Sequence, residues 1–98
     1  MIDIIVSTEL SDMILNGSLN NIKEYGCSKK VVEELSEIYN IIRSCTCIYD
    51  LKSFPWLNFK QEKDGMKCSV SVGKEKFRLV ISIDSSDSIF IESLIKGY

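Results

Sequence analysis

Strict alternation of apolar and other residues over positions 66–83 is the feature that most restricts the fold of this 98-residue chain. Before the turn "GKEK" at 73–76, the apolar set is Met66, Cys68, Val70 and Val72, and the polar set is Lys67, Ser69 and Ser71. After the turn, the apolar set is Phe77, Leu79, Ile81 and Ile83, and the second set is Arg78, Val80 and Ser82. Because successive side chains of a strand point to opposite faces, this pattern predicts a β-hairpin with one apolar face and one largely polar face.

The rest of the chain predicts two helical segments. A short apolar run at 3–7 predicts a first strand, after which Ser7 and Thr8 are placed to cap a helix. That helix is weakly patterned, because "NGSLNN" interrupts it and would divide it in two, and Gly26 is placed to end it. A second helix over 29–45, capped by Ser28, is predicted by the stripe Val31, Leu35, Ile38 and Ile42. Three glutamates lie off that stripe and are expected to be solvated, namely Glu33, Glu34 and Glu37.

A third strand over "SIFIESLI" follows the turn "DSSD" and completes the predicted order. This order is a strand, one or two helices, a long link and three strands. It predicts an α+β fold in which the helices pack on one face of a mainly antiparallel sheet. With 98 residues, 45% of them hydrophobic, we expect one domain over residues 1–98 with a single modest core. The N-terminus reaches a charge at Asp3 without a long apolar run, so we expect no signal peptide, no membrane span and a cytoplasmic protein.

Four cysteines and the absence of histidine restrict the chemistry of any site. Reducing conditions in the cytoplasm predict that Cys27, Cys45, Cys47 and Cys68 are free thiols. Without histidine or paired C-x-x-C motifs, we expect no zinc site and no other cofactor. Ser-His and Cys-His nucleophile pairs are excluded, which leaves carboxylate, lysine, tyrosine or cysteine as a general acid or base.

Charge is unevenly distributed along the chain. Residues 1–50 hold four Lys/Arg and eight Asp/Glu, residues 51–82 hold seven and three, and residues 83–98 hold one and three. The middle third is therefore basic, although the net charge of the whole chain is −2. A local concentration of this kind is typical of a phosphate-binding face, and a solvated lysine-rich hairpin explains it equally well.

The link over residues 45–65 has no clear period and contains the only proline of the chain. A connection of this length inside a small domain is more often functional or packed as a unit than idle. Phe54, Trp56 and Phe59 alternate within it and are expected to cover one edge of the core, with exposed aromatics that stack on bases as the alternative.

The polar face of the hairpin is expected to display Arg78 among serines and Lys67. A guanidinium offers forked donors that suit a phosphate, and short hydroxyl side chains leave room for a nucleic-acid backbone to approach. Arg78 is therefore predicted to be a phosphate ligand that faces away from the core.

The segments "FKQEKDGMKCSVSVGKEKFRLVISID" and "IIRSCTCIYDLKSFPWLN" resemble the RelE/ParE superfamily of toxins from toxin-antitoxin pairs. Within it they are most similar to the HigB-like branch, the plasmid maintenance killer proteins. The former segment resembles that branch's charged turn, strand, glycine-bearing turn and aromatic-Arg-Leu strand, and the latter is similar to its helix end followed by a leucine-proline link. The resemblance implies a RelE-like order of β-α-(α)-β-β-β over essentially the whole chain.

The resemblance also implies a function, which is cleavage of messenger RNA in the ribosomal decoding site by attack of a 2′-hydroxyl on the adjacent phosphate. By position, Arg78 would stabilise the phosphorane, Lys60 would contact or neutralise phosphate, and Tyr98 would act in proton transfer or stack a base. The lysines of the basic segment are the expected RNA contacts, namely Lys63, Lys67, Lys74 and Lys76. Where the branch often has a histidine before its lysine, this chain has Leu57 and Asn58, and Lys96, Gly97 and Tyr98 replace its terminal Asp-Tyr-His.

Three functions therefore stand as alternatives. The first is a ribosome-dependent mRNA endonuclease that is a monomer on its own and is held in check by an antitoxin of the helix-turn-helix type. The second is an interaction module, either a ParE-like gyrase inhibitor or a catalytically silent relative that binds an antitoxin. The third is a small structural domain with a solvated hairpin.

Overall fold

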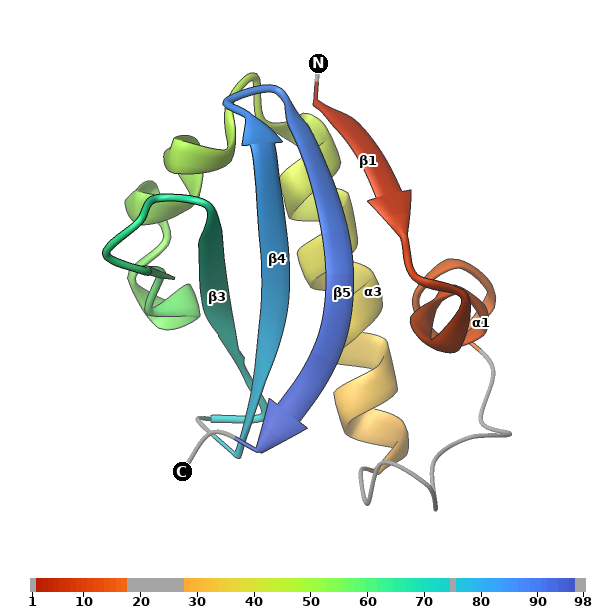
Figure 1. Cartoon of the computed structure of the whole chain (residues 1–98). Helices are drawn as coiled ribbons and strands as arrows, with labels where there is room; N and C mark the ends of the chain where they lie inside the picture. Colours follow the sequence, from red (N-terminus) through yellow and green to blue (C-terminus); the bar gives the residue numbers. More distant parts are fainter. Residues whose placement is uncertain (1, 18–27, 75, 97–98) are drawn as a thin grey trace.

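The computed structural model of the chain describes residues 2–17, 28–74 and 76–96. Strand β1 and helices α1 and α3 come first, then two 3-10 helices, η1 and η2, and then strands β2 to β5 (Figure 1). Their bounds are β1 (Asp3–Val6), α1 (Thr8–Asn16), α3 (Lys29–Ser44), η1 (Ile48–Ser53), η2 (Pro55–Leu57), β2 (Lys60–Gln61), β3 (Lys67–Val72), β4 (Phe77–Ser85) and β5 (Ser88–Lys96).

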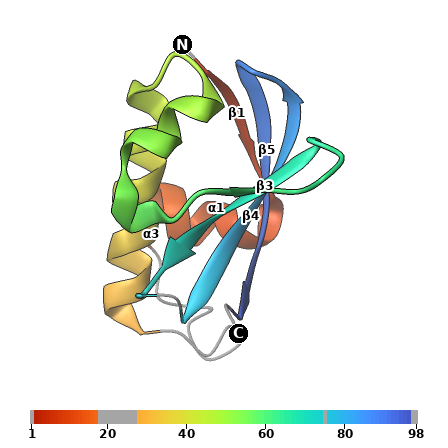
Figure 2. The same ribbon diagram turned by 90° about the vertical axis from the view of Figure 1, so that its left-hand side faces the viewer.

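One sheet contains the five strands in the order β1-β5-β4-β3-β2. β1 runs parallel to β5, and every other neighbouring pair is antiparallel. Figure 2 shows α3 and the two 3-10 helices together on one side of the sheet. The α+β fold with a mainly antiparallel sheet, predicted from the sequence, is therefore confirmed.

The core lies between that side of the sheet and the helices. The stripe predicted for the second helix is buried on α3 at Val31, Leu35, Ile38 and Ile42. The apolar residues of β3 and β4 meet it, among them Val70, Val72, Leu79 and Ile81. Helix α1 adds three buried side chains, Leu10, Met13 and Ile14. The apolar face of the strands, which repeats every 2.0 residues, and the apolar stripe of α3, which repeats every 3.6 residues, therefore pack against each other.

Helix α1 begins and ends with backbone interactions. Ser7 occupies the predicted N-cap position, but its side chain makes no capping hydrogen bond, and its carbonyl accepts from the amides of Leu10 and Ser11. The helix ends at Gly17, whose φ of 64° is in the left-handed region that favours glycine. The predicted second half of this helical segment and its end at Gly26 lie outside the described residues.

The long link is packed as a unit. η1 and η2 bury Ile48, Leu51 and Leu57, and β2 then joins the edge of the sheet. Phe54 and Phe59 pack against the core as predicted. Trp56 does not, because it is 63% exposed and contacts Phe54 edge-to-face with ring centroids 5.2 Å apart. The prediction that all three aromatics cover the core is therefore wrong for Trp56.

Among the described cysteines, Cys45, Cys47 and Cys68 are free. Cys45 and Cys68 are buried, and burial raises the pKa of the Cys68 thiol to about 12. In the described part of the chain, no group of three or more cysteine or acidic side chains is arranged to hold a metal ion. No helix within residues 2–17, 28–74 and 76–96 combines the length and the apolar character that crossing a membrane requires.

Candidate functional site

The face of the sheet that points away from α3 carries the polar residues of the hairpin, and we call it the open face (Figures 1 and 2). Opposite residues of neighbouring strands share a face, so the pairs Lys67↔Ser82, Ser69↔Val80 and Ser71↔Arg78 all belong to it. Towards β1 this face becomes apolar, where Ile5 is paired with Phe90 and both side chains are exposed.

Arg78 lies at the second position of β4 and crosses β3 on the open face. Its Nε donates to Ser69 Oγ at 2.9 Å, and its Nη2 donates to the carbonyls of Ser69 at 2.9 Å and Asn58 at 2.7 Å. Asn58 precedes β2, so these bonds tie β4 to β3 and to the end of η2. The planar fork of the guanidinium suits this task, because one side chain reaches several oxygens at once.

Arg78 differs in one respect from its prediction. It lies on the face opposite the apolar one, as the alternation indicates, but only 7% of it is exposed, and Ser71 beside it is also buried. The guanidinium is therefore part of the hydrogen bonding of the sheet and does not extend into solvent, although the side chain faces away from the apolar core as predicted. A short polar neighbour such as Ser69 provides both a hydroxyl and an accessible carbonyl for it.

Lys60 is brought close to this arginine by β2. Its Cα partner is Ser69, the residue that accepts from Arg78 twice, and residues paired in this way project to the same face. Lys60 itself is exposed. The sheet therefore brings together two of the three residues that the resemblance assigned to catalysis. The third, Tyr98, lies outside the described residues.

A second polar cluster on the open face consists of Lys67, Ser82 and Glu92. Lys67 Nζ is 3.3 Å from Glu92 Oε2, and Ser82 Oγ donates to the same carboxylate. The side chains of Lys67 and Glu92 are 44% and 26% exposed. The hydrogen bond from Ser82, followed by Lys67, outweighs burial and holds the pKa of Glu92 below its usual value.

The predicted RNA-binding lysines are divided between two ends of the hairpin. Lys63 and Lys67 lie at or near the β2–β3 turn, whereas Lys74 and Lys76 lie in the β3–β4 turn. β3 separates the two groups by six residues, which is about 20 Å of strand. Lys67 is also paired with Glu92. The four lysines therefore do not form a single continuous patch.

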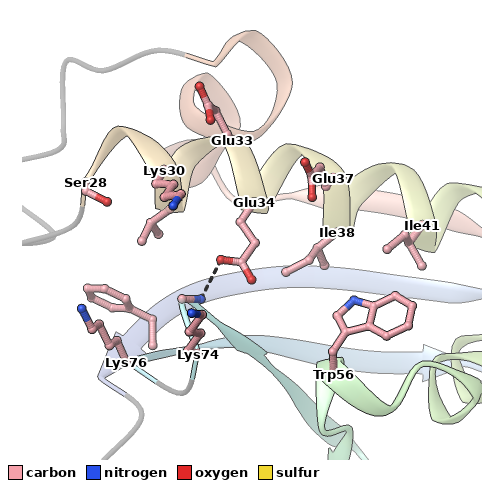
Figure 3. Close-up of a pocket in the computed structure, with 13 residues that line it drawn as sticks. Ser28, Lys30, Glu33, Glu34, Glu37, Ile38, Ile41, Trp56, Lys74 and Lys76 are labelled. Carbon is pink, nitrogen blue, oxygen red and sulfur yellow. Dashed lines mark hydrogen bonds between the residues drawn. The ribbon is translucent and has the colours of Figure 1, made fainter.

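Lys74 and Lys76 line a cavity of about 590 Å³ between the start of α3 and the β3–β4 turn (Figure 3). Glu34 points from α3 into it and accepts a hydrogen bond of 2.8 Å from the amide of Gly73. Its lining also includes Trp56 and apolar side chains such as Ile38. The lining is mixed in charge, with Lys30, Lys74 and Lys76 near Glu33, Glu34 and Glu37. It belongs to the helix side of the sheet and is separate from the open face.

The sequence does not predict the positions of two carboxylates, Glu34 and Glu92. Glu34 was expected to be solvated, but it satisfies the amide of a turn residue with a φ of 64°. Glu92 was not identified as a site residue, because its strand "SIFIESLI" shows no clean alternation. The register explains this pattern, since Val80 pairs with Ser93 and Ile81 pairs with Ile91, which leaves Glu92 as the extra residue of a β-bulge.

The fold and the open face define a small α+β protein with a cationic arginine-lysine-serine site on an exposed sheet. Comparison of the chain with protein-family models, with curated proteins and with solved structures found no match. The function is therefore inferred from the residues and their geometry.

Proposed function

We propose that this protein is the toxin of a toxin-antitoxin pair, a RelE-like and specifically HigB-like endonuclease that cuts messenger RNA on the ribosome. The observation that carries the proposal is the position of Arg78, held on the open face by hydrogen bonds to Ser69 and Asn58, next to the strand partner of Lys60. The resemblance of residues 41–84 to the HigB-like branch assigns this arginine and this lysine to the RNA phosphate.

Such a cleavage reaction needs cationic groups close to the phosphate. When the 2′-hydroxyl attacks the adjacent phosphate, negative charge develops on the phosphorane oxygens. A guanidinium that is already fixed in place stabilises this charge without reorganisation during the reaction. Lys60, which is exposed beside it, would neutralise the incoming phosphate.

The small polar side chains of the open face support the proposal that an RNA backbone approaches it. Its centre is lined by small side chains, Ser69 and Ser71 among them, and no described helix covers it. In this proposal the ribosome presents the message, and an antitoxin of the helix-turn-helix type neutralises the toxin before it acts. Tyr98 keeps the role that the resemblance implies for it.

A second candidate function is favoured by one specific observation. Each hydrogen bond named above from Arg78 ties strands of the sheet together, as a structural arginine would. A relative that has lost catalysis but still binds an antitoxin would keep this arrangement. A ParE-like gyrase inhibitor would also keep it.

The test is to add the purified protein to translating bacterial ribosomes and to map the 5′ ends of the messenger RNA. The variant Lys60→Ala removes an exposed cation from the open face, and Lys29→Ala removes an exposed lysine from α3 on the helix side as a matched control. We expect cuts in the decoding site with the wild type and with Lys29→Ala, and weaker cutting with Lys60→Ala. Intact message in the presence of folded protein would refute the endonuclease. Growth inhibition with DNA-damage signalling and uncut message would then identify a gyrase inhibitor.

A further inference from the structure

The cluster of Lys67, Ser82 and Glu92 on the open face is not explained by the roles assigned so far. Lys67 and Ser82 are direct cross-strand partners on β3 and β4, and Glu92 reaches both of them from β5. A surface salt bridge of this kind contributes little to stability, about 0–1 kcal/mol. A stabilising role therefore gives only a weak reason for this arrangement.

The bulge in β5 is what brings Glu92 to this face. Ile91 and Leu94 are both buried on the helix side, although strict alternation would place residues three apart on opposite faces. The extra residue at Glu92 resolves this conflict, and the carboxylate points to the open face while both apolar side chains stay in the core. Bulges of this kind re-aim side chains and are over-represented beside active sites.

Glu92 also lies at a suitable distance from the phosphate site. The guanidinium of Arg78 is fixed at Ser69, and Lys67 is two residues from Ser69 along β3. This spacing corresponds to about 7 Å of strand. The guanidinium lies at Ser69 on β3, with Lys60 beside it on β2 and with Glu92, which reaches Lys67 from β5, about two residues further along the sheet. An in-line displacement needs a proton acceptor and a proton donor on opposite sides of the phosphorus.

We propose that Glu92 is the proton acceptor for the attacking 2′-hydroxyl, an assignment that rests on the endonuclease function proposed above. The O–H bond of the 2′-hydroxyl breaks and its proton passes to the Glu92 carboxylate. The electron pair left on the 2′-oxygen forms the 2′-O–P bond. The P–O5′ bond then breaks, and the leaving oxygen takes a proton from the Lys60 ammonium. The products are a 2′,3′-cyclic phosphate and a 5′-hydroxyl, and exchange with water restores both side chains. Ser82 and Lys67 are positioning residues that aim the carboxylate.

This assignment supplies the base that a chain without histidine otherwise lacks. A carboxylate is one of the few proton acceptors that the composition allows, and Glu92 is held on the open face by Ser82 and Lys67. Glu34, by contrast, lies on the helix side and accepts from the backbone amide of a turn. The two carboxylates therefore have different tasks, which their positions on opposite sides of the sheet explain.

The experiment measures single-turnover cleavage on translating ribosomes for the wild type, Glu92→Gln, Glu92→Ala and the control Glu37→Gln, which changes an exposed carboxylate on α3. Glutamine can still accept the hydrogen bond from Ser82 and loses only the surface salt bridge to Lys67, so co-sedimentation with ribosomes should not change and the thermal unfolding midpoint should change little. We expect Glu92→Gln to cut about 100-fold more slowly or worse, the usual contribution of a general base. We also expect sodium formate, but not sodium chloride at equal ionic strength, to restore part of the rate of Glu92→Ala.

Each other outcome overturns the assignment in a recognisable way. Equal cutting by the wild type and Glu92→Gln leaves the endonuclease intact and removes Glu92 from its mechanism. A slow Glu92→Gln that also binds ribosomes weakly or unfolds early, with no rescue by formate, identifies the cluster as a structural bridge. No cutting by the folded wild type refutes the endonuclease itself and this assignment with it.

Discussion

Replacing Arg78 by alanine should destabilise the fold strongly, in contrast to what its place on the polar face of a strand predicts. The substitution withdraws the donors from Ser69 Oγ and from the carbonyls of Ser69 and Asn58. These bonds are part-buried, and a hydrogen bond to a charged group contributes about 1.5–3 kcal/mol to stability. Two carbonyls together with the lost packing of the arginine stem give an expected loss of about 3 kcal/mol in the free energy of unfolding.

This loss is large for a domain of this size. Domains are stable by about 5–15 kcal/mol, and in one of about 100 residues each kcal/mol lowers the melting temperature by about 4–8 °C. Arg78→Ala is therefore expected to melt about 12–24 °C below the wild type. Thermal and urea unfolding followed by far-ultraviolet circular dichroism measure both quantities without relying on the single tryptophan, which is already exposed.

The matched control is Arg43→Ala on α3. Arg43 is exposed and lies 5.7 Å from the centre of the Tyr39 ring, a contact worth about 0.5–1 kcal/mol at an exposed site. Arg78→Lys should fall between the two, because an ammonium keeps the charge but lacks the planar fork. If Arg78→Ala and Arg43→Ala unfold at the same urea concentration, the structural role derived for Arg78 is wrong.

Three further predictions concern other parts of the molecule. Gly73→Ala should lower the free energy of unfolding by about 1–2 kcal/mol in urea titrations, because φ is +64° and the new methyl group would lie 3.3 Å from Val31 Cγ2. Since the native Cys68 pKa is about 12 against an ordinary 9.0, the folded state keeps a proton that the unfolded state loses between these values. The free energy of unfolding should therefore fall as pH rises above 9.0, and it should fall less in Cys68→Ala. If it depends on pH equally in both proteins, the raised pKa assigned to Cys68 is wrong. Acrylamide should quench the fluorescence of Trp56 almost as efficiently in the native protein as in urea, because its ring is 63% exposed; strong native protection would show that this surface is covered.

The elements that the sequence predicts well are those with one dominant period. α3 repeats apolar residues every three or four positions, and β3 alternates strictly, so each has a single way to bury its apolar side chains. The buried faces of these two elements can therefore be predicted from local spacing alone, without knowledge of tertiary contacts. The order of the elements then restricts the sheet to a mainly antiparallel one with helices on one side.

The features that the sequence does not predict depend on contacts between distant segments. Arg78 is buried because Asn58, twenty residues earlier, offers its carbonyl, and no spacing rule reveals such a partner. Glu92 reaches the open face through a bulge that breaks the alternation of β5, and so the pattern itself conceals it. Glu34 was expected to be solvated because it is charged, although it lies four residues from the buried Ile38 and so beside the apolar stripe of α3, where Gly73 approaches it from the β3–β4 turn.

The burial of Arg78 changes how its chemistry must be tested. A guanidinium held by hydrogen bonds to Ser69 is well prepared to stabilise a phosphorane, because its orientation is determined by folding and not by substrate. The same bonds make Arg78→Ala unsuitable as evidence for catalysis, since a destabilised protein loses activity for either reason. Lys60 has no such ambiguity, because it is exposed on the same face. In the proposed endonuclease, removing the exposed lysine should therefore raise the concentration needed for half-maximal cutting and, because Lys60 protonates the leaving oxygen, also lower the rate at saturation. The conservative Arg78→Lys, measured below its own melting temperature, should mainly lower the rate at saturation, because the fork of donors matters most when charge develops on the phosphorus.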